Sequence, residues 1–235
     1  MSLCEGFVEI GAGVGSLTLA LLETGAEVTA VEIDRHLLPI LHEVAEPAGA
    51  RVVQGDAMSM DWTALLGDHS WVLVANLPYN VATPLVATLL DEVPAVAHMV
   101  VMVQREVGQR LAAGVGDPAY GAVSVKVTYW ATARLVGRVP PTVFLPQPAV
   151  DSVLVALERR SAPAVDPAEV APAALFSLVR AGFAQRRKML RRSLAGHVDH
   201  EAFLRAGIRP EARAEELDVI DWGRLAMCVR QPPVH

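Results

Sequence analysis

The sequence predicts an α/β protein with a parallel β-sheet covered by helices on both faces, followed by a smaller helical segment. Over the first 105 residues, short apolar runs of β-type residues alternate with stretches of helical pattern, which is typical of parallel sheets with two buried faces. After residue 172 the pattern becomes helical. A chain of 235 residues is long enough for one large domain or two unequal ones.

The predicted strands of the first half are apolar runs that end in turn residues: 7–10, 27–33, 51–54, 71–75 and 97–103. The first strand runs into the glycine-rich turn 11–15, and a helix is expected over residues 16–23, ending near Gly25. Two further strands are expected at 132–139 and 153–157, with a proline-punctuated loop between them.

The second half of the chain is less regular in pattern. Residues 120–129 are rich in β-branched side chains, so propensity alone predicts a strand there. Residues 161–172, rich in proline and alanine, resemble a linker. We therefore expect one domain over residues 1–160 and a second over residues 161–235. Helices are expected in the second domain at 173–194, 201–206 and 222–228.

Charge is divided unevenly along the chain. The formal net charge of −6 argues against a protein that binds nucleic acid over its whole surface. Residues 1–160 carry 9 Lys and Arg against 17 Asp and Glu, whereas residues 161–235 carry 11 against 9. The sequence thus describes an acidic body with a mildly basic C-terminal part.

Several classes of protein are disfavoured by what the sequence lacks. No apolar run reaches the roughly 18 residues of a transmembrane helix, and no signal-peptide pattern is present. Cys4 and Cys228 lie near opposite ends without a redox or metal-binding motif, as expected for reduced thiols. No histidine motif has the spacing of metal ligands. We expect a cytoplasmic monomer that requires neither a metal nor a membrane.

Four polar or glycine positions each follow a separate predicted strand. They are Gly11, Glu32, Asp56 and Asn76. Because ligands bind α/β sheets at the carboxyl ends of the parallel strands, we expect these four positions to meet at one edge.

The glycine-rich turn and the carboxylates indicate the type of ligand. The turn lacks the lysine of a triphosphate-binding loop, and Glu32 follows Gly11 by about the twenty residues expected of a carboxylate that binds ribose hydroxyls. A nicotinamide or flavin enzyme fits these two features almost as well as a methyltransferase. Glu9 and Asp56 add carboxylates that suit a cofactor with a cationic amino-acid end and no phosphates, such as S-adenosylmethionine. The alternative for both acids is a helix cap or a surface charge.

The tetrapeptide Asn76-Leu77-Pro78-Tyr79 suits a flat base that carries an amine. The side-chain oxygen of Asn76 can accept a hydrogen bond from the amine, Pro78 fixes the direction of nearby backbone carbonyls, and Tyr79 offers a ring for stacking. The alternative is a strand-ending turn in which Tyr79 belongs to the core.

Together, the motifs VEIGAGVGSLT, VEID, GDA, NLPYN and VFLPQPAVDS resemble the KsgA family of ribosomal RNA adenine dimethyltransferases. The resemblance runs from about Phe7 to Arg192. It implies a class I S-adenosylmethionine-dependent methyltransferase fold, with a Rossmann-like seven-stranded sheet and a small all-α C-terminal domain. It also implies that residues 120–129 form part of a helix, against their propensity.

The resemblance assigns a role to each matching residue. Contacts to S-adenosylmethionine are implied for Glu9, Gly11, Gly13, Glu32, Ile33, Asp56, Ala57 and Asn76. Among them, Glu9 and Gly11 would lie near the methionine part, Glu32 would bind the ribose and Asp56 the adenine amine. Target recognition and catalysis are implied for Asn76, Leu77, Pro78, Tyr79 and Phe144, with the two aromatic rings on opposite faces of a flipped adenine.

The segment FAQRRKMLRRSL matches the basic stretch of the family, and no acid lies between Ser177 and Arg192. RNA contact is expected for Arg180, Arg186, Arg187, Lys188, Arg191 and Arg192, and binding should then be salt-sensitive. The alternative is a solvated helix face. The implied substrate is small-subunit rRNA within the immature small ribosomal subunit, with two adjacent adenines near its 3′ end dimethylated at the 6-amino group.

One feature departs from the family. Its members usually begin with a longer N-terminal arm, containing an NFL-type motif, that covers the cofactor and the target base. The chain starts almost at the first predicted strand, and its first residues Met1-Ser2-Leu3 suggest a truncated chain or a late start site. We therefore expect reduced cofactor affinity and turnover.

Three other functions stay open at this point. A related resistance-type enzyme would modify an adenine of large-subunit rRNA. An assembly factor would bind immature small subunits, with methylation secondary or lost. A nicotinamide-dependent oxidoreductase would bind NAD and would not respond to S-adenosylmethionine.

Overall fold

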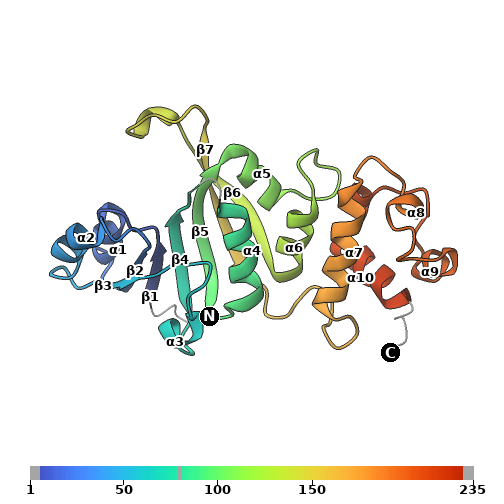
Figure 1. The fold of residues 1–235 in the computed structure, drawn as a ribbon, viewed down its shortest axis with the longest axis horizontal. Coiled ribbons are helices and arrows are strands. Elements are labelled where there is room, and N and C mark those ends of the chain that lie inside the picture. The colour runs from blue at the N-terminus through green and yellow to red at the C-terminus, as the bar shows by residue number, and fades with distance from the viewer. Residues whose placement is uncertain (1–5, 79–80, 230–235) are drawn as a thin grey trace. The chain divides into compact units, whose positions relative to one another are not determined.

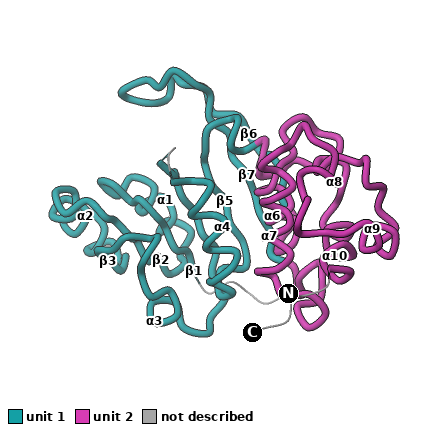
Figure 2. The backbone as a smooth tube through the Cα atoms, turned by 45° about the vertical axis from the view of Figure 1, so that its right-hand side comes forward, with its two compact units in different colours: residues 1–108, 133–159 teal, residues 109–132, 160–235 magenta. Residues whose placement is uncertain are grey.

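The computed structural model describes residues 6–78 and 81–229. The chain forms two compact units, coloured teal and magenta in Figure 2. The first consists of residues 1–108 and 133–159, and the second of residues 109–132 and 160–235. The two domains expected at 1–160 and 161–235 stay a prediction; the compact units differ from them in that residues 109–132 group with the C-terminal helices.

In the described part of the chain, seven strands form one sheet in the order β3-β2-β1-β4-β5-β7-β6. The strands are β1 (Gly6–Ile10), β2 (Glu27–Glu32), β3 (Arg51–Gln54), β4 (Trp71–Asn76), β5 (Val96–Gln104), β6 (Ala131–Val139) and β7 (Ser152–Arg159). Strands β1 to β5 pair in parallel, and β7 is antiparallel to β5. The predicted α/β fold is confirmed, and each of these strands overlaps one that the sequence predicts.

Helices in the first unit are α1 (Ser16–Leu22), α2 (Leu38–Ala45), α3 (Trp62–Leu66), α4 (Ala82–Glu92) and the first half of α5 (Arg105–Ala112). Helix α1 contacts β2, α2 contacts β3, and α4 lies against β5 (Figure 1). The strands between them are apolar because both faces of the sheet are covered: Val8, Val28, Leu73 and Val101 are fully buried.

Helix α4 is fixed at its C-terminal end by Arg159, the last residue of β7. The guanidinium group donates to four carbonyl oxygens, those of Leu89 at 3.0 Å, Leu90 at 2.8 Å, Val93 at 3.0 Å and Val96 at 3.0 Å. A cation at this end of a helix complements the helix dipole and donates to carbonyls of its last turn and of the segment that follows. Burial lowers the pKa of Arg159, and the nearby Asp91 opposes that shift.

The strand that propensity predicts at 120–129 is wrong, because this segment forms helix α6 (Ala122–Trp130). The backbone N–H of Gly121 donates to Ser124 Oγ at 3.0 Å, and that hydroxyl donates to the carbonyl of Arg110 at 2.6 Å. The helix buries Val125 and Tyr129 completely in the core of the second unit. Tertiary packing therefore overrides the β propensity of its side chains, and the resemblance is correct here.

The second unit packs its helices around a core that includes Tyr129, Phe176, Phe203 and Trp222. Its C-terminal helices are α7 (Pro172–Ala184), α8 (Leu190–Ser193), α9 (His200–Ala206) and α10 (Val219–Cys228). Tyr129 and Phe176 meet edge to face, with ring centroids 5.1 Å apart. Within the described part of the chain, no helix is long and apolar enough to cross a membrane.

The single helix expected over residues 173–194 is interrupted after Ala184. There the backbone pairs with a later segment instead of continuing the helix: the N–H of Leu190 donates to the carbonyl of Ala212 at 2.7 Å, and Met189 forms a β-bridge with Arg213. The interruption falls inside the basic segment, so the basic side chains do not all extend from one continuous helix.

Candidate active site

The carboxyl ends of four neighbouring parallel strands bring Gly11, Glu32, Asp56 and Asn76 to one edge of the sheet. The N–H of Gly11 donates to Val31 O at 2.9 Å, and the N–H of Gly55 donates to Glu32 O at 3.0 Å. A side chain on Gly11, whose φ is 74°, would meet the carbonyl of Asn76 at 3.8 Å. The predicted convergence is therefore confirmed.

Glu32 holds the glycine-rich turn in place. Its Oε2 accepts the N–H of Gly13 at 2.7 Å, and its Oε1 accepts the N–H of Asp34 at 2.8 Å, while the residue is 5% exposed. A carboxylate has about four acceptor positions, so both oxygens keep capacity for the hydroxyl groups of a ligand.

Glu9 lies within the sheet just before the turn and is 1% exposed. Its Oε2 accepts a hydrogen bond of 2.5 Å from the hydroxyl of Thr18 on α1. Burial raises the pKa of Glu9 to about 7; the Thr18 hydrogen bond opposes this shift, and the negative charge of Glu32 adds to it. A carboxyl group with such a pKa exists in both protonation states near neutral pH.

A cavity of about 230 Å³ opens at this edge of the sheet. It is lined by Ile10, Gly11, Val31, Ile33, Gly55, Asp56, Ala57, Met58, Pro78, Val81 and Leu85. The lining is apolar apart from Asp56, an exposed residue whose Oδ1 accepts the N–H of Met58 at 2.9 Å. Apolar walls with one acceptor suit a flat base that carries an amine.

The backbone of Asn76, Leu77 and Pro78 is fixed by hydrogen bonds to β5 and to the start of α4. Asn76 ends β4 in register with Met102, and the N–H of Leu77 donates to Met102 O at 3.1 Å. The carbonyl of Pro78 accepts the N–H groups of Val81 and Ala82, which begin α4. Pro78 also lines the cavity. Asn76 is exposed and the side chain of Leu77 is buried. Tyr79 lies outside the described residues.

Phe144 is carried on the loop between β6 and β7, which extends away from the sheet (Figure 1). The edge of the sheet that carries Gly11, Glu32, Asp56 and Asn76 is called the rim. The loop ends at this rim, because Ser152 at the start of β7 pairs with Gln104 at the end of β5. Phe144 is half-buried, whereas Leu145 beside it is 100% exposed.

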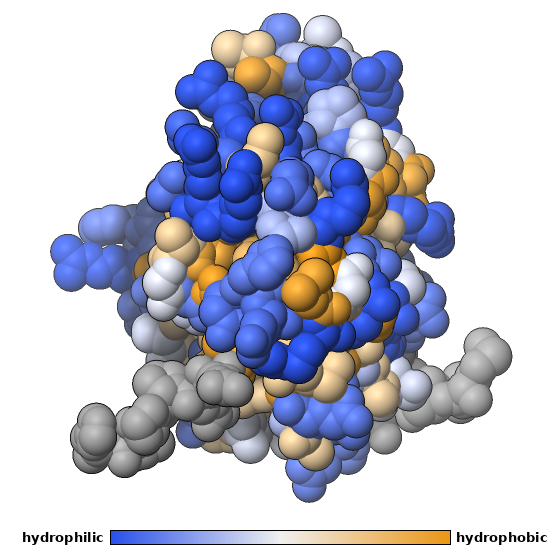
Figure 3. Space-filling model, turned by 90° about the vertical axis from the view of Figure 1, so that its right-hand side faces the viewer, coloured by the Kyte–Doolittle hydropathy of each residue, from blue (hydrophilic) through white to orange (hydrophobic). Residues whose placement is uncertain are grey.

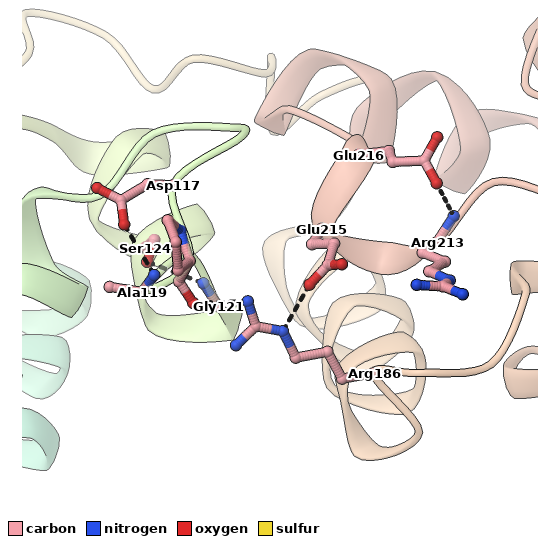
Figure 4. Close-up of polar contacts among 9 residues, drawn as sticks. Asp117, Ala119, Gly121, Ser124, Arg186, Arg213, Glu215 and Glu216 are labelled. Atoms are coloured by element: carbon pink, nitrogen blue, oxygen red, sulfur yellow. Dashed lines mark hydrogen bonds and ion pairs between the residues drawn. The ribbon is translucent and has the colours of Figure 1, made fainter.

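The six basic residues predicted to contact RNA divide into two groups. Arg186 and Arg191 make ion pairs within the protein, and the other four do not pair with any described residue. Arg186 is engaged: its Nε donates to Glu215 Oε2 at 2.7 Å (Figure 4), and a terminal nitrogen donates to the carbonyl of Pro118 at 2.7 Å. Arg191 makes a long, exposed ion pair of 3.9 Å with Glu211.

The other predicted RNA contacts are exposed cations without an ion pair to any residue that the structure describes: Arg180, Arg187, Lys188 and Arg192. Figure 3 looks at the face of the second unit and shows it largely hydrophilic, with scattered hydrophobic side chains. This surface suits a hydrated, charged partner.

Comparison with known sequences decides the family. The sequence profile described as ribosomal RNA adenine dimethylase matches residues 5–231. The chain belongs to this family.

Its curated relatives are similar over most of their length. This rRNA adenine dimethylase is 46% identical to "Ribosomal RNA small subunit methyltransferase A" of Acidothermus cellulolyticus, over 97% of the chain and 79% of the relative. It is 47% identical to the protein of the same name from Thermobifida fusca, over 93% of the chain and 78% of the relative.

Two solved structures share its fold. A dimethyladenosine transferase from Plasmodium falciparum superposes with a TM-score of 0.78 at 24% identity, over 96% of this chain and 90% of that one. The 23S rRNA methyltransferase ErmE superposes with a TM-score of 0.73 at 24% identity, over 98% and 93%. The class I methyltransferase fold is therefore confirmed.

S-adenosylmethionine is the cofactor of this rRNA adenine dimethylase, and the rim fits it. The cavity lining contains no Lys or Arg among the described residues, in keeping with a ligand without phosphates, and Asp56 supplies an acceptor for an adenine amine. Glu9 and Glu32 place two carboxylates beside the glycine-rich turn. When bound, the cofactor supplies a methyl group on a positively charged sulfur.

Sequence reasoning missed two residues that shape the site. Thr18 is the hydrogen-bond partner of Glu9, and its place in VEIGAGVGSLT was a signal that could have been used. Arg159 anchors the far end of α4, the helix that begins at the tetrapeptide, and nothing in the local sequence indicates it.

Proposed function

We propose that the chain dimethylates the 6-amino groups of two adjacent adenines near the 3′ end of small-subunit rRNA. The similarity to relatives named small-subunit methyltransferases supports this substrate. The observation that most supports the proposal is that residues at the end of β4 face both the cavity and solvent. Pro78 lines the cofactor-type cavity, while Asn76, two residues earlier, offers an exposed amide to a base.

The cofactor roles follow the rim. Glu32, which keeps free acceptor positions, is proposed to bind the ribose hydroxyls, and Asp56 the adenine amine, with Ile33 and Ala57 forming apolar walls for the base. Glu9 and the turn that contains Gly11 and Gly13 are proposed to receive the methionine part.

The target adenine is proposed to bind at Asn76-Leu77-Pro78-Tyr79. Its amine is a poor nucleophile because the lone pair is delocalised into the ring. Hydrogen bonds from the amine to Asn76 Oδ1 and to the carbonyl of Leu77 favour a pyramidal nitrogen with a localised lone pair. The register with β5 and the start of α4 hold these acceptors in place, so positioning supplies most of the rate.

The base has to leave its stack to reach this edge, which costs a few kcal/mol. Stacking on Tyr79 and Phe144 is proposed to offset this cost, at about 1–3 kcal/mol for each face. The exposed cations near the interruption after α7 are proposed to bind RNA phosphates. An rRNA substrate also leads us to place the enzyme in the cytoplasm, where we expect it to act as a monomer.

A methyl-transfer assay tests the proposal. The chain is incubated with methyl-labelled S-adenosylmethionine and immature small or large ribosomal subunits, and the adenines of the digested RNA are analysed by mass spectrometry. We expect dimethyladenine in small-subunit rRNA only, and Asn76→Ala should lower the rate about 100-fold. Gln104→Ala, which removes another amide at the same edge, is the matched control and should keep activity.

Other outcomes redirect the proposal. Label in large-subunit RNA alone would favour the resistance-type enzyme. An Asn76→Ala chain that still supports subunit maturation, together with a wild-type chain that transfers no methyl group, would favour the assembly factor.

A further inference from the structure

Glu9 and Thr18 form an isolated polar pair inside the first unit. Glu9 is 1% exposed and Thr18 is 0% exposed, and a hydrogen bond of 2.5 Å joins them. The strand neighbours in register with Glu9 are Ala30 on β2 and Val74 on β4, both apolar in type. A buried carboxylate is costly unless hydrogen bonds or an opposite charge compensate it.

No cation from the described residues compensates Glu9. Within that part of the chain it makes no ion pair, and the charged group that acts on it is a second carboxylate, Glu32. Both Glu32 oxygens accept backbone N–H groups, so this second carboxyl group is held in place near Glu9. Burial and the second carboxylate thus disfavour the ionised form of Glu9, whereas the Thr18 hydrogen bond favours it and a cationic ligand would compensate its charge.

We propose that Thr18 is a positioning residue, which holds the Glu9 carboxylate in its ionised form for the cationic amino-acid end of S-adenosylmethionine. The inference rests on the proposed cofactor role of Glu9. Helix α1 then has a function beyond packing. Its Thr18 is fully buried, and the hydroxyl of this residue donates to Glu9.

The inference predicts how cofactor affinity depends on pH. With a Glu9 pKa of about 7, half of the ligand-free protein carries the ionised form at neutral pH. If the ligand requires that form, affinity is about twofold below its maximum at pH 7 and about tenfold below it at pH 6. Removing the Thr18 hydrogen bond, which favours the ionised form, should move this loss to higher pH.

Two variants separate the hydroxyl from the shape of the side chain. Thr18→Val keeps the volume and loses the hydroxyl, whereas Thr18→Ser keeps the hydroxyl and loses a methyl group. Dissociation constants for S-adenosylmethionine are measured by calorimetry between pH 6 and pH 9 on each folded protein. Taking the ratio of variant to wild type cancels the titration of the ligand's own amino group.

We expect the Thr18→Val ratio to be about five- to tenfold between pH 6 and pH 7 and close to one at pH 9. Thr18→Ser should follow the wild type at every pH. A Thr18→Val ratio that does not change with pH would mean that Thr18 only packs, and would overturn the inference. So would a Thr18→Ser ratio that equals that of Thr18→Val.

The remaining outcomes are also decisive. If Thr18→Val does not fold, Thr18→Cys replaces it, because a thiol is a weak hydrogen-bond donor. The ratio of Thr18→Cys to wild type should then lie between the ratio measured for Thr18→Ser and the ratio predicted above for Thr18→Val. A wild-type chain that binds no S-adenosylmethionine at any pH would refute the proposed cofactor role of Glu9 and this role of Thr18 with it, whereas cofactor binding with a Thr18→Val ratio that does not change with pH would refute the role of Thr18 alone.

Discussion

Arg186 and Arg187 are adjacent in the basic segment, yet they should respond differently when neutralised. Arg186 is held by Glu215 and by the carbonyl of Pro118, whereas Arg187 is exposed and makes no ion pair to the described residues. We therefore expect Arg187 to contact RNA phosphate and Arg186 to stabilise the second unit. Each is replaced by Gln, which removes the charge and keeps much of the length.

The magnitude follows from the number of available cations. Arg180, Arg187, Lys188 and Arg192 are unpaired within the described residues, and the weak 3.9 Å pair of Arg191 adds a fifth at most. Each phosphate contact contributes about −0.7 to −0.9 to the slope of log K against log salt, so a wild-type slope of about −3 to −4 is expected from this segment. Arg187→Gln should reduce the slope by about one contact, to roughly −2 to −3.

Arg186→Gln should leave the slope unchanged and lower stability. Its ion pair is about 40% exposed on both sides, so the loss is only about 1–2 kcal/mol, or a few degrees in melting temperature. Binding of a small-subunit rRNA fragment is measured by fluorescence anisotropy between 50 and 200 mM salt, and melting by circular dichroism. Equal slope changes for the two variants would refute the division of the basic segment.

Three further predictions concern stability. Burial raises the pKa of Glu9 from 4.5 to about 7. The contribution of this carboxyl group to the free energy of unfolding is therefore fully present below pH 4.5, and up to about 3 kcal/mol of it is lost as the pH rises through 7. Glu9→Gln should then be more stable than wild type at pH 8 and gain less at pH 5 in urea unfolding; equal gains would contradict this. Arg159→Met removes the guanidinium donor from four carbonyls, of which those of Leu89 and Val93 keep a backbone N–H donor, and should cost about 2–5 kcal/mol, with little rescue by Lys, as measured by the urea midpoint. Gly182→Ala would place a Cβ 2.5 Å from the Trp222 ring and should cost about 1–3 kcal/mol in thermal unfolding; an unchanged melting temperature would show that the ring can move.

The sheet and its rim could be predicted because their signals are local. Each parallel strand is a continuous apolar run, and topology alone takes the ends of such strands to one edge. This is why Gly11, Glu32, Asp56 and Asn76 could be grouped from the sequence alone. The carboxylates and the tetrapeptide suggested a cofactor such as S-adenosylmethionine and a base that carries an amine, and the resemblance narrowed these to a methyl donor and an adenine of ribosomal RNA.

The parts that failed depend on contacts distant in sequence. Residues 120–129 have β propensity, but Val125 and Tyr129 gain more by packing as a helix in the second core. The break after Ala184 arises from pairing with residues 210–213, and the engagement of Arg186 arises from Glu215, both invisible to local pattern. Sequence spacing therefore located the basic segment but could not say which of its charges are free.

The rim of the first unit, formed by Gly11, Glu32, Asp56 and Asn76, is expected to bind S-adenosylmethionine. Calorimetric titration of the chain with S-adenosylmethionine and, separately, with NAD tests it most directly. We expect saturable binding of one S-adenosylmethionine per chain, weakened when Glu32 or Asp56 is neutralised, and no binding of NAD. Binding of NAD, or no binding of S-adenosylmethionine under any condition in which the chain is folded, would contradict it.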